Sequence, residues 1–234
     1  MASVVELRAA VTLTGRFPAL AGVDLTAAAG DVVVLEGANG AGKTSLLRLC
    51  AGLLPVTGGA AVVLGCDLRR DPAAVRRRVG LLGHDAAVYD DLTVVENVRF
   101  AVRASGGDPA AVNPALDRVE LVGRLRRTPA GRLSAGQRRR MALAVLVARR
   151  PELWLLDEPH AALDAAGRRL VADLVTAAAV GGAAVLLASH EPHESLPLAD
   201  RVVTLAGGRA VDEQPGLRRP PTAAPALTED AHVG

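Results

Sequence analysis

The segment GANGAGKT, residues 37–44, has the spacing of a phosphate-binding loop. A short β-branched run that starts after Asp31 precedes it and apolar residues at helical spacing follow it, so the loop joins a strand to a helix. Its glycines let successive backbone N–H groups point at phosphate oxygens, and the helix adds its positive end. Lys43 is then placed to contact the β- and γ-phosphates, and the Thr44 hydroxyl to bind Mg²⁺. The alternative, a glycine-rich turn that only caps a helix, is disfavoured by this context.

Lys43 is also the only lysine in the chain, because the other 26 of the 27 Lys and Arg residues are arginine. A planar guanidinium and a compact ammonium are not interchangeable. The composition therefore indicates that this one position requires the compact ammonium.

Two adjacent acids, Asp157 and Glu158, follow the apolar run at residues 153–156. A buried strand has little reason to end in neighbouring carboxylates unless a cation or a proton donor meets them. Asp157 suits the Mg²⁺ shell, and Glu158 suits the general base that orients an attacking water. An ordinary acidic loop would look similar, so this signal gains its weight from the phosphate loop.

Ser134 and His190 are weaker candidates when each is taken alone. Ser134, in LSAGQ, is well placed to cap the helix predicted after it, whose first turn offers free N–H groups. His190 follows the apolar run at residues 185–188, where a histidine is commonly a hydrogen-bonded core residue. We expect His160 and His193 to lie at the surface.

The elements that must position these residues alternate along the chain. Short apolar runs predict buried strands at residues 62–64, 79–82, 153–156, 185–188 and 202–205, and helices are predicted at 135–149 and 165–178. This alternation predicts an α/β fold with a largely parallel sheet. The middle, about residues 90–148, is predicted to be an inserted helical subdomain, since it has few strand signals and several Gly and Pro breaks. Residues 207–234 are rich in Pro, Gly and Ala and predict a disordered tail after a domain spanning 1–206.

Composition narrows the class of protein. The 234 residues suffice for one well-buried domain, and the sequence has neither an apolar stretch long enough to cross a bilayer nor a secretory signal, so we expect a cytoplasmic protein. Cys50 and Cys66 lack metal-ligand spacing and are expected to be small core residues. The net charge of +2, with scattered basic residues and few aromatics, argues against a nucleic-acid partner.

Five motifs taken together resemble those of ABC ATPases. GANGAGKT resembles the family's Walker A loop, LWLLDEP its Walker B strand, LSAGQ its LSGGQ signature, AALD its D-loop, and ASH its switch histidine, in the family's order and over about residues 3–206. The resemblance implies an ABC cassette: a P-loop NTPase with a RecA-like core, an antiparallel β edge and an inserted helical subdomain. It also implies an ATP hydrolase that uses ATP and Mg²⁺.

The resemblance implies roles for individual residues as well. Two cassettes meet head to tail, and each ATP is held by the Walker loop of one subunit and the signature of the other, so a homodimer or a paired relative is expected. Glu158, His190 and Lys43 are the implied catalytic residues, and Thr44, Asp157 and His84 the implied metal site. The implied nucleotide-binding residues are Gly37, Ala38, Asn39, Gly40, Ala41, Gly42, Lys43, Thr44, Ser45, Phe17, His84, Ser134, Gly136, Gln137 and Asp164.

Two positions depart from the family pattern. His84 stands where relatives usually have a glutamine that relays the state of the site to the transporter, and an imidazole cannot mimic both ends of an amide. The tyrosine that usually stacks on adenine is absent, and Phe17 is the nearby aromatic, for which stacking and a core or surface role are equally open.

The segment around His84, LSAGQRRRMALA and the tryptophan in LWLLDEP together resemble the ATP-binding subunit of the cytochrome c biogenesis haem exporters. Such a chain supplies energy to integral membrane subunits and lies on the cytoplasmic face of the membrane through them. A generic ABC exporter ATPase for drugs or lipids is the alternative within the class. Soluble ABC proteins that act on nucleic acid are less favoured because they carry two cassettes or long coiled-coil insertions. An inactive binding module is disfavoured by the intact acids and lysine.

Overall fold

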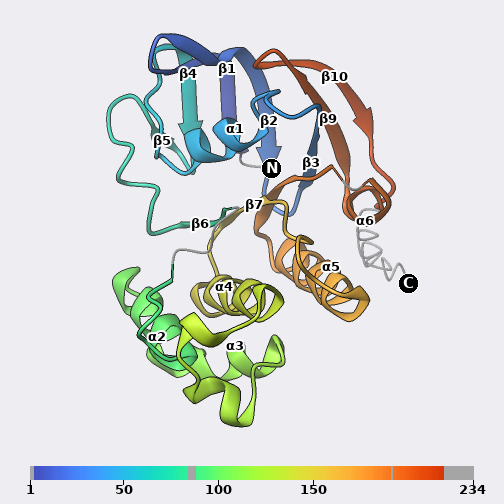
Figure 1. The fold of residues 1–234 in the computed structure, drawn as a ribbon. Helices are drawn as coiled ribbons and strands as arrows, with labels where there is room; N and C mark the ends of the chain where they lie inside the picture. Colours follow the sequence, from blue (N-terminus) through green and yellow to red (C-terminus); the bar gives the residue numbers. More distant parts are fainter. Residues whose placement is uncertain (1–2, 84–87, 191, 219–234) are drawn as a thin grey trace, which may run out of the picture.

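The computed structural model describes residues 3–83, 88–190 and 192–218. Its strands form two sheets, one four-stranded in the order β2-β1-β4-β5 and one six-stranded in the order β10-β9-β3-β8-β7-β6 (Figure 1). The strands are β1 (Ser3–Thr14), β2 (Phe17–Ala28), β3 (Val32–Glu36), β4 (Gly58–Val63), β5 (Cys66–Asp67), β6 (Val79–Leu82), β7 (Leu153–Asp157), β8 (Ala184–Ala188), β9 (Arg201–Ala206) and β10 (Arg209–Pro215).

The helices form two groups, one on the faces of the six-stranded sheet and one in a helical lobe, and one helix belongs to both groups (Figure 1). They are α1 (Lys43–Cys50), α2 (Val94–Ala104), α3 (Val112–Arg118), α4 (Ala135–Arg149), α5 (Ala165–Val180) and α6 (Pro192–Ser195). Short 3-10 turns are η1 (Pro109–Ala111), η2 (Gly123–Arg127), η3 (Ala130–Arg132) and η4 (Leu196–Leu198). α2 and α3 pack on one another and on α4, and the three helices form the helical lobe of this structure.

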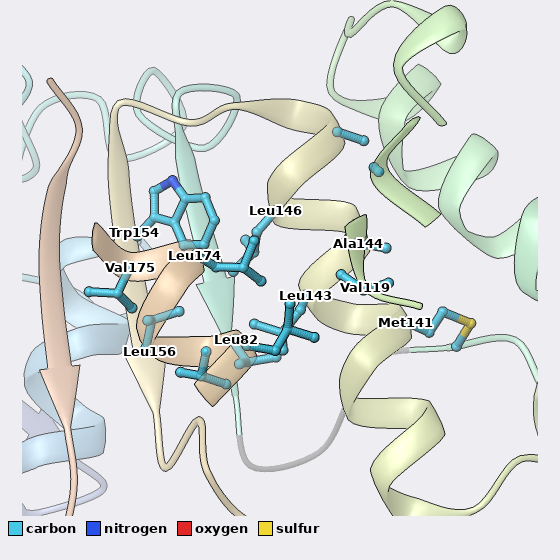
Figure 2. Packing of buried hydrophobic residues seen from close by; sticks show 14 of the residues in the cluster. Leu82, Val119, Met141, Leu143, Ala144, Leu146, Trp154, Leu156, Leu174 and Val175 are labelled. Carbon is cyan, nitrogen blue, oxygen red and sulfur yellow. The ribbon is translucent and has the colours of Figure 1, made fainter. Parts of the chain in front are cut away.

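The six-stranded sheet separates two hydrophobic cores, because neighbouring residues of a strand face opposite sides. Val33, Leu155 and Leu186 lie in the core shared with α1 and the antiparallel sheet, whereas Val34 and Leu187 lie in the core shared with α4 and α5. Figure 2 shows the second core, where Trp154 and Leu156 of β7 meet Leu143 and Leu146 of α4 and Leu174 and Val175 of α5. Each fully buried leucine contributes about 2 kcal/mol of transfer free energy, so both faces anchor the sheet.

Strand pairing brings three chain segments to one edge of the sheet. β3 pairs in parallel with β8, and β8 pairs in parallel with β7. Parallel strands end on the same side, where α/β proteins bind ligands. The phosphate loop follows β3, the two acids follow or end β7, and His190 follows β8, so the topology alone gathers the predicted residues.

Several predicted elements are confirmed, and three expectations need correction. β10 occupies residues 209–215, within the predicted disordered tail, because its backbone pairs with β9 despite its polar sequence. His160 is 3% exposed and not a surface residue, whereas His193 is exposed as expected. Cys66 is only partly buried, whereas Cys50 is fully buried, and neither forms a disulfide.

No helix in the described part of the chain is both long and apolar enough to traverse a lipid bilayer.

Candidate nucleotide site

The phosphate loop adopts a backbone that only glycine tolerates at its first position. Gly37 has φ of 138°, and a Cβ placed there would lie 2.2 Å from the Leu205 carbonyl oxygen. The loop therefore passes directly against β9. Ala41 strengthens this contact, because its carbonyl accepts a hydrogen bond from the Gly208 N–H at 3.0 Å. The result is a loop whose shape is fixed by its neighbours.

Lys43 is the first residue of α1 and is only 8% exposed. Its Nζ donates hydrogen bonds to the Gly37 carbonyl at 2.5 Å and the Ala38 carbonyl at 3.3 Å. Two carbonyls of the loop therefore hold the ammonium against the loop. This is the position from which a compact cation reaches phosphate oxygens.

Thr44 and Asp157 meet although 113 residues separate them in the chain. The Thr44 hydroxyl donates to Asp157 Oδ2 at 2.8 Å, which joins the start of α1 to the end of β7. Asp157 is 5% exposed, so its carboxylate lies in a largely dry setting. A hydroxyl and a carboxylate are the hard oxygen ligands that Mg²⁺ prefers.

Glu158 and His190 form a second pair beside the first. His190 Nδ1 lies 2.8 Å from Glu158 Oε1, and the His190 backbone N–H donates to Glu158 Oε2 at 3.4 Å. The Glu158 side chain is 19% exposed and that of His190 is 64% exposed, so the pair lies at the rim of the site. The carboxylate is thus held by His190 and also borders the cavity described next.

A single cavity of about 550 Å³ unites these groups. Its lining contains the predicted residues Asn39, Gly40, Ala41, Gly42, Lys43, Thr44, Ser45, Asp157, Glu158 and His190. Sequence reasoning missed Pro18, Ala19, Gly207 and Gly208, which also line it. They come from the antiparallel sheet and from the β9–β10 turn, and no spacing in the sequence links them to the loop.

The signature residues lie elsewhere on the molecule. Ser134, Gly136, Gln137 and Asp164 line a separate cavity of about 430 Å³, which shares no lining residue with the first. Ser134 caps α4 by accepting from the Gln137 N–H at 3.2 Å, and Gln137 Oε1 accepts from the Ser134 N–H at 3.0 Å. One chain therefore does not bring its signature to its own Lys43.

Gly136 is tightly fitted in this second cavity. A Cβ at Gly136 would lie 2.9 Å from the carbonyl oxygen of Ala162, in the segment that ends at Asp164. Asp164 caps α5 by accepting from the Gly167 N–H at 2.7 Å. The small residue is thus required by close packing of the signature against the predicted D-loop.

Phe17 and His84 are the two departures from the family pattern. Phe17 is 79% exposed at the start of β2, beside Pro18 of the cavity lining, and its stacking on a base stays a prediction. His84 lies outside the described residues. The carbonyl of Gly83, the residue before it, accepts a hydrogen bond from Arg139.

Arg139 is a functional candidate that sequence reasoning missed. It lies on α4 and is 5% exposed, and its guanidinium donates to the backbone carbonyls of Gly83, Asp157 and Glu158. Burial lowers the pKa of Arg139, and the nearby carboxylates of Asp157 and Glu158 act in the opposite direction. One signal was present, because Arg139 precedes Leu143 and Leu146 at the i, i+4, i+7 spacing of a buried helix face.

The fold and the site define a class of protein, and comparison with known families agrees. The family described as ABC transporter matches residues 20–161. The chain belongs to this family, as one of its ATP-binding subunits. Within it, the chain is similar to proteins named cytochrome c biogenesis ATP-binding export protein CcmA.

Two such relatives illustrate the similarity. The protein from Rhodopseudomonas palustris (strain BisB18) is 46% identical over 187 residues, which cover 80% of this chain and 90% of the relative. The protein from Bordetella bronchiseptica is 42% identical over 187 residues, covering 79% of this chain and 83% of the relative. A solved dimeric ATP-binding cassette in a post-hydrolysis state, bound to ADP and Pi, superposes with a TM-score of 0.83 at 24% identity and covers 92% of this chain and 99% of that one. That likeness supports the fold.

Proposed function

We propose that this chain binds and hydrolyses Mg-ATP as the motor subunit of an ABC exporter that serves cytochrome c biogenesis, with haem as the exported or remodelled species. The observation that carries the hydrolytic part is the common cavity of Lys43, Thr44, Asp157, Glu158 and His190. A cation, two oxygen ligands, a carboxylate base and an imidazole converge there from three neighbouring strand ends. Phosphoryl transfer needs this combination of positioning and charge.

In the proposed reaction the loop amides and Lys43 hold the β- and γ-phosphates. Glu158 accepts a proton from the attacking water while the water oxygen forms a bond to the γ-phosphorus. The bond between that phosphorus and the β–γ bridging oxygen breaks. The products are ADP and phosphate. His190, which contacts Glu158, is suited to orient the carboxylate and to contact the γ-phosphate.

The residues present fit a magnesium ion. Thr44 Oγ1 and Asp157 Oδ2 converge within 2.8 Å, and among the described residues no cluster of three or more His, Cys, Asp or Glu side chains forms an all-protein metal cage. Mg²⁺ typically uses one or two protein oxygens together with phosphates and waters. When bound, Mg²⁺ would neutralise charge on the β- and γ-phosphate oxygens.

The separation of the two cavities supports a dimer as the active form. Ser134 and Gly136 do not line the cavity of Lys43, and a second copy in two-fold arrangement would bring its signature to that cavity. We propose that Asp164, beside the signature, links the two sites. The chain has one set of motifs, so both halves come from copies or close relatives.

A groove between α2 of the helical lobe and β6 of the six-stranded sheet is the proposed contact with the membrane subunits. It has a volume of about 920 Å³ and contains Leu53, Tyr89 and Phe100, which are 53%, 56% and 51% exposed. Tyr89 and Phe100 meet edge to face with ring centroids 5.1 Å apart. Exposed apolar groups gathered in a groove mark a binding surface. Gly83 also lines this groove, and its carbonyl accepts a hydrogen bond from Arg139. We assign the groove to an apolar cytoplasmic segment of the transporter.

Glu158→Gln tests the hydrolytic proposal, because an amide keeps the size of the side chain and cannot take the proton. We expect ATP turnover to fall at least about a hundredfold, as befits a general base, with ATP still bound and the dimer trapped. Size-exclusion chromatography with ATP and steady-state phosphate release measure both. Normal turnover would remove Glu158 from its role.

A second experiment tests the cargo. Host cells that carry Lys43→Ala in place of the wild-type chain should lose covalent haem staining of their c-type cytochromes, while free haem is still made. Phe100→Asp should give the same loss because it weakens binding to the membrane subunits. Reduced co-purification with those subunits, with ATP binding intact, would show this. Unchanged cytochrome staining in both strains would favour a generic drug or lipid exporter.

A further inference from the structure

The conformation of Glu158 needs support that its own strand does not provide. Glu158 has φ of 49°, in the left-handed region that is unfavourable for a residue other than glycine. Its N–H is held by the Ala188 carbonyl of β8 at 2.9 Å. This bond fixes one side of the residue, and the direction of the side chain also depends on how the carbonyl side is held.

Arg139 holds the carbonyl side. Its Nη2 donates to the Asp157 carbonyl at 3.0 Å and also to the Glu158 carbonyl, and its Nη1 donates to the Gly83 carbonyl at 2.7 Å. One rigid guanidinium thus fixes two successive peptide planes at the end of β7. The planar fork suits this task, since a lysine ammonium lacks its geometry.

Keeping a buried cation here is costly. Arg139 is 5% exposed, and the three acceptors given above are backbone carbonyls, not carboxylates. A buried charge that is not directly paired with an opposite charge is a poor way to gain stability. The position of Arg139 is therefore better explained by what it does to the chain that it contacts.

We propose that Arg139 is the positioning residue of the catalytic base: it locks the backbone of Glu158 so that the carboxylate faces the attacking water, and so sets the rate of hydrolysis without setting ATP affinity. The proposal rests on the hydrolytic function proposed above. The hydrogen bonds given above connect Arg139 to neither the phosphate loop nor Lys43, and Arg139 lies five residues after the signature residue Ser134.

Arg139→Ala in the full chain tests this by steady-state ATP hydrolysis. We expect kcat to fall about tenfold or more, with the KM for ATP within about twofold of the wild-type value, because the loss is confined to the hydrolytic step. Arg149→Ala is the matched control: Arg149 is a partly buried arginine at the other end of α4. It also donates to backbone carbonyls, those of Val79 at the start of β6 and of Arg76 and Arg77 just before it. Its loss should lower the thermal stability without changing kcat per folded molecule.

The Glu158→Gln background separates positioning from general damage. If Arg139 acts through Glu158, removing it from the Glu158→Gln protein should leave the residual turnover unchanged within about twofold, since effects of residues that act as a unit do not add. Equal fold-losses in both backgrounds, or a kcat for Arg139→Ala within twofold of wild type, would overturn the proposal. Should Arg139→Ala fail to fold, Arg139→Gln, which keeps one donor group, carries the same comparison. A wild-type chain that does not hydrolyse ATP would instead refute the proposed function.

Discussion

At the scale of single residues, the contact between His190 and Glu158 is the most informative in the site. The imidazole lies at the exposed rim and touches the proposed base with Nδ1. A histidine in that place adds little to folding, because it is largely in solvent. Its contribution is expected in the reaction.

His190→Ala should lower kcat by about 10- to 100-fold, in the lower range of effects for groups that assist proton transfer. The melting temperature should stay within a degree or two of the wild-type value, since the side chain is 64% exposed. Phosphate release and differential scanning fluorimetry check the two expectations. His193→Ala, an exposed histidine on α6, is the control and should leave turnover unchanged.

The two thiols should differ sharply in reactivity. Burial raises the pKa of the Cys50 thiol to about 12, so only about one molecule in ten thousand is thiolate at pH 8, whereas Cys66 is partly exposed. A maleimide or iodoacetamide should therefore modify one thiol in the native chain and two after denaturation. Mass spectrometry at pH 8 reads the count, and rapid native labelling of Cys50 would contradict the buried α1 core.

Site residues that belong to short sequence motifs could be predicted from the sequence, because each motif specifies the residue types and their spacing. The predicted residues Lys43, Thr44, Asp157, Glu158 and His190 all line one cavity of the structure. Arg139 was not found, because its helical spacing with Leu143 and Leu146 indicates a buried face and does not identify the backbone carbonyls to which it donates. What it contacts depends on how α4 docks on β7, and docking is a tertiary property.

At the scale of elements, the same capping motif occurs at two helices with different surroundings. Ser134 and Gln137 form a capping box at α4, and Thr93 and Glu96 form one at α2. Only the first lies in the signature cavity. Comparing the two capping boxes therefore separates the effect of a cap on folding stability from an effect of Ser134 on ATP turnover.

Ser134→Ala should cost about 1 kcal/mol of unfolding free energy, the usual loss for a cap, and should also reduce ATP turnover several-fold. Thr93→Ala should give a similar loss of stability and normal turnover. Urea unfolding and ATPase assays of the two variants make the comparison. Equal turnover in both would mean that Ser134 is only a cap.

The main parallel strands and the two long helices were predictable because their apolar patterns are regular, and α4 begins and ends where its pattern does. The antiparallel sheet was harder. β1 contains register shifts and a residue, Ala9, with φ of 43°, so its inward and outward positions do not alternate cleanly. β10 is exposed and polar, and its pairing with β9 leaves no hydrophobic signal.

At the scale of the whole molecule, hydrogen bonds join the segment after β10 to the start of β3. Arg218 Nη1 donates to Asp200 Oδ2 at 2.6 Å and to the Gly30 carbonyl at 3.1 Å. The same Asp200 oxygen accepts from the Val32 N–H at 2.8 Å, at the start of β3. One carboxylate thus joins β3 to the segment after β10.

Arg218→Ala should destabilise the fold by about 2 kcal/mol, below the full cost of breaking a buried ion pair because both side chains keep some exposure. The reference is Arg8→Ala, which breaks an exposed pair with Glu6 and should cost less than about 1 kcal/mol. Chemical denaturation of both variants measures the difference. A loss for Arg218→Ala no larger than that for Arg8→Ala would show that the C-terminal fastening is dispensable.

Because the phosphate loop contains the chain's single ε-amino group, reagents that acylate primary amines have one side-chain target here besides the amino terminus. That target is 8% exposed and held by two carbonyls, so its acylation rate reports directly on how open the loop is. A protease specific for lysine would likewise cut the chain at one place. Bound nucleotide should protect that bond, so occupancy of the site becomes readable as a single band on a gel.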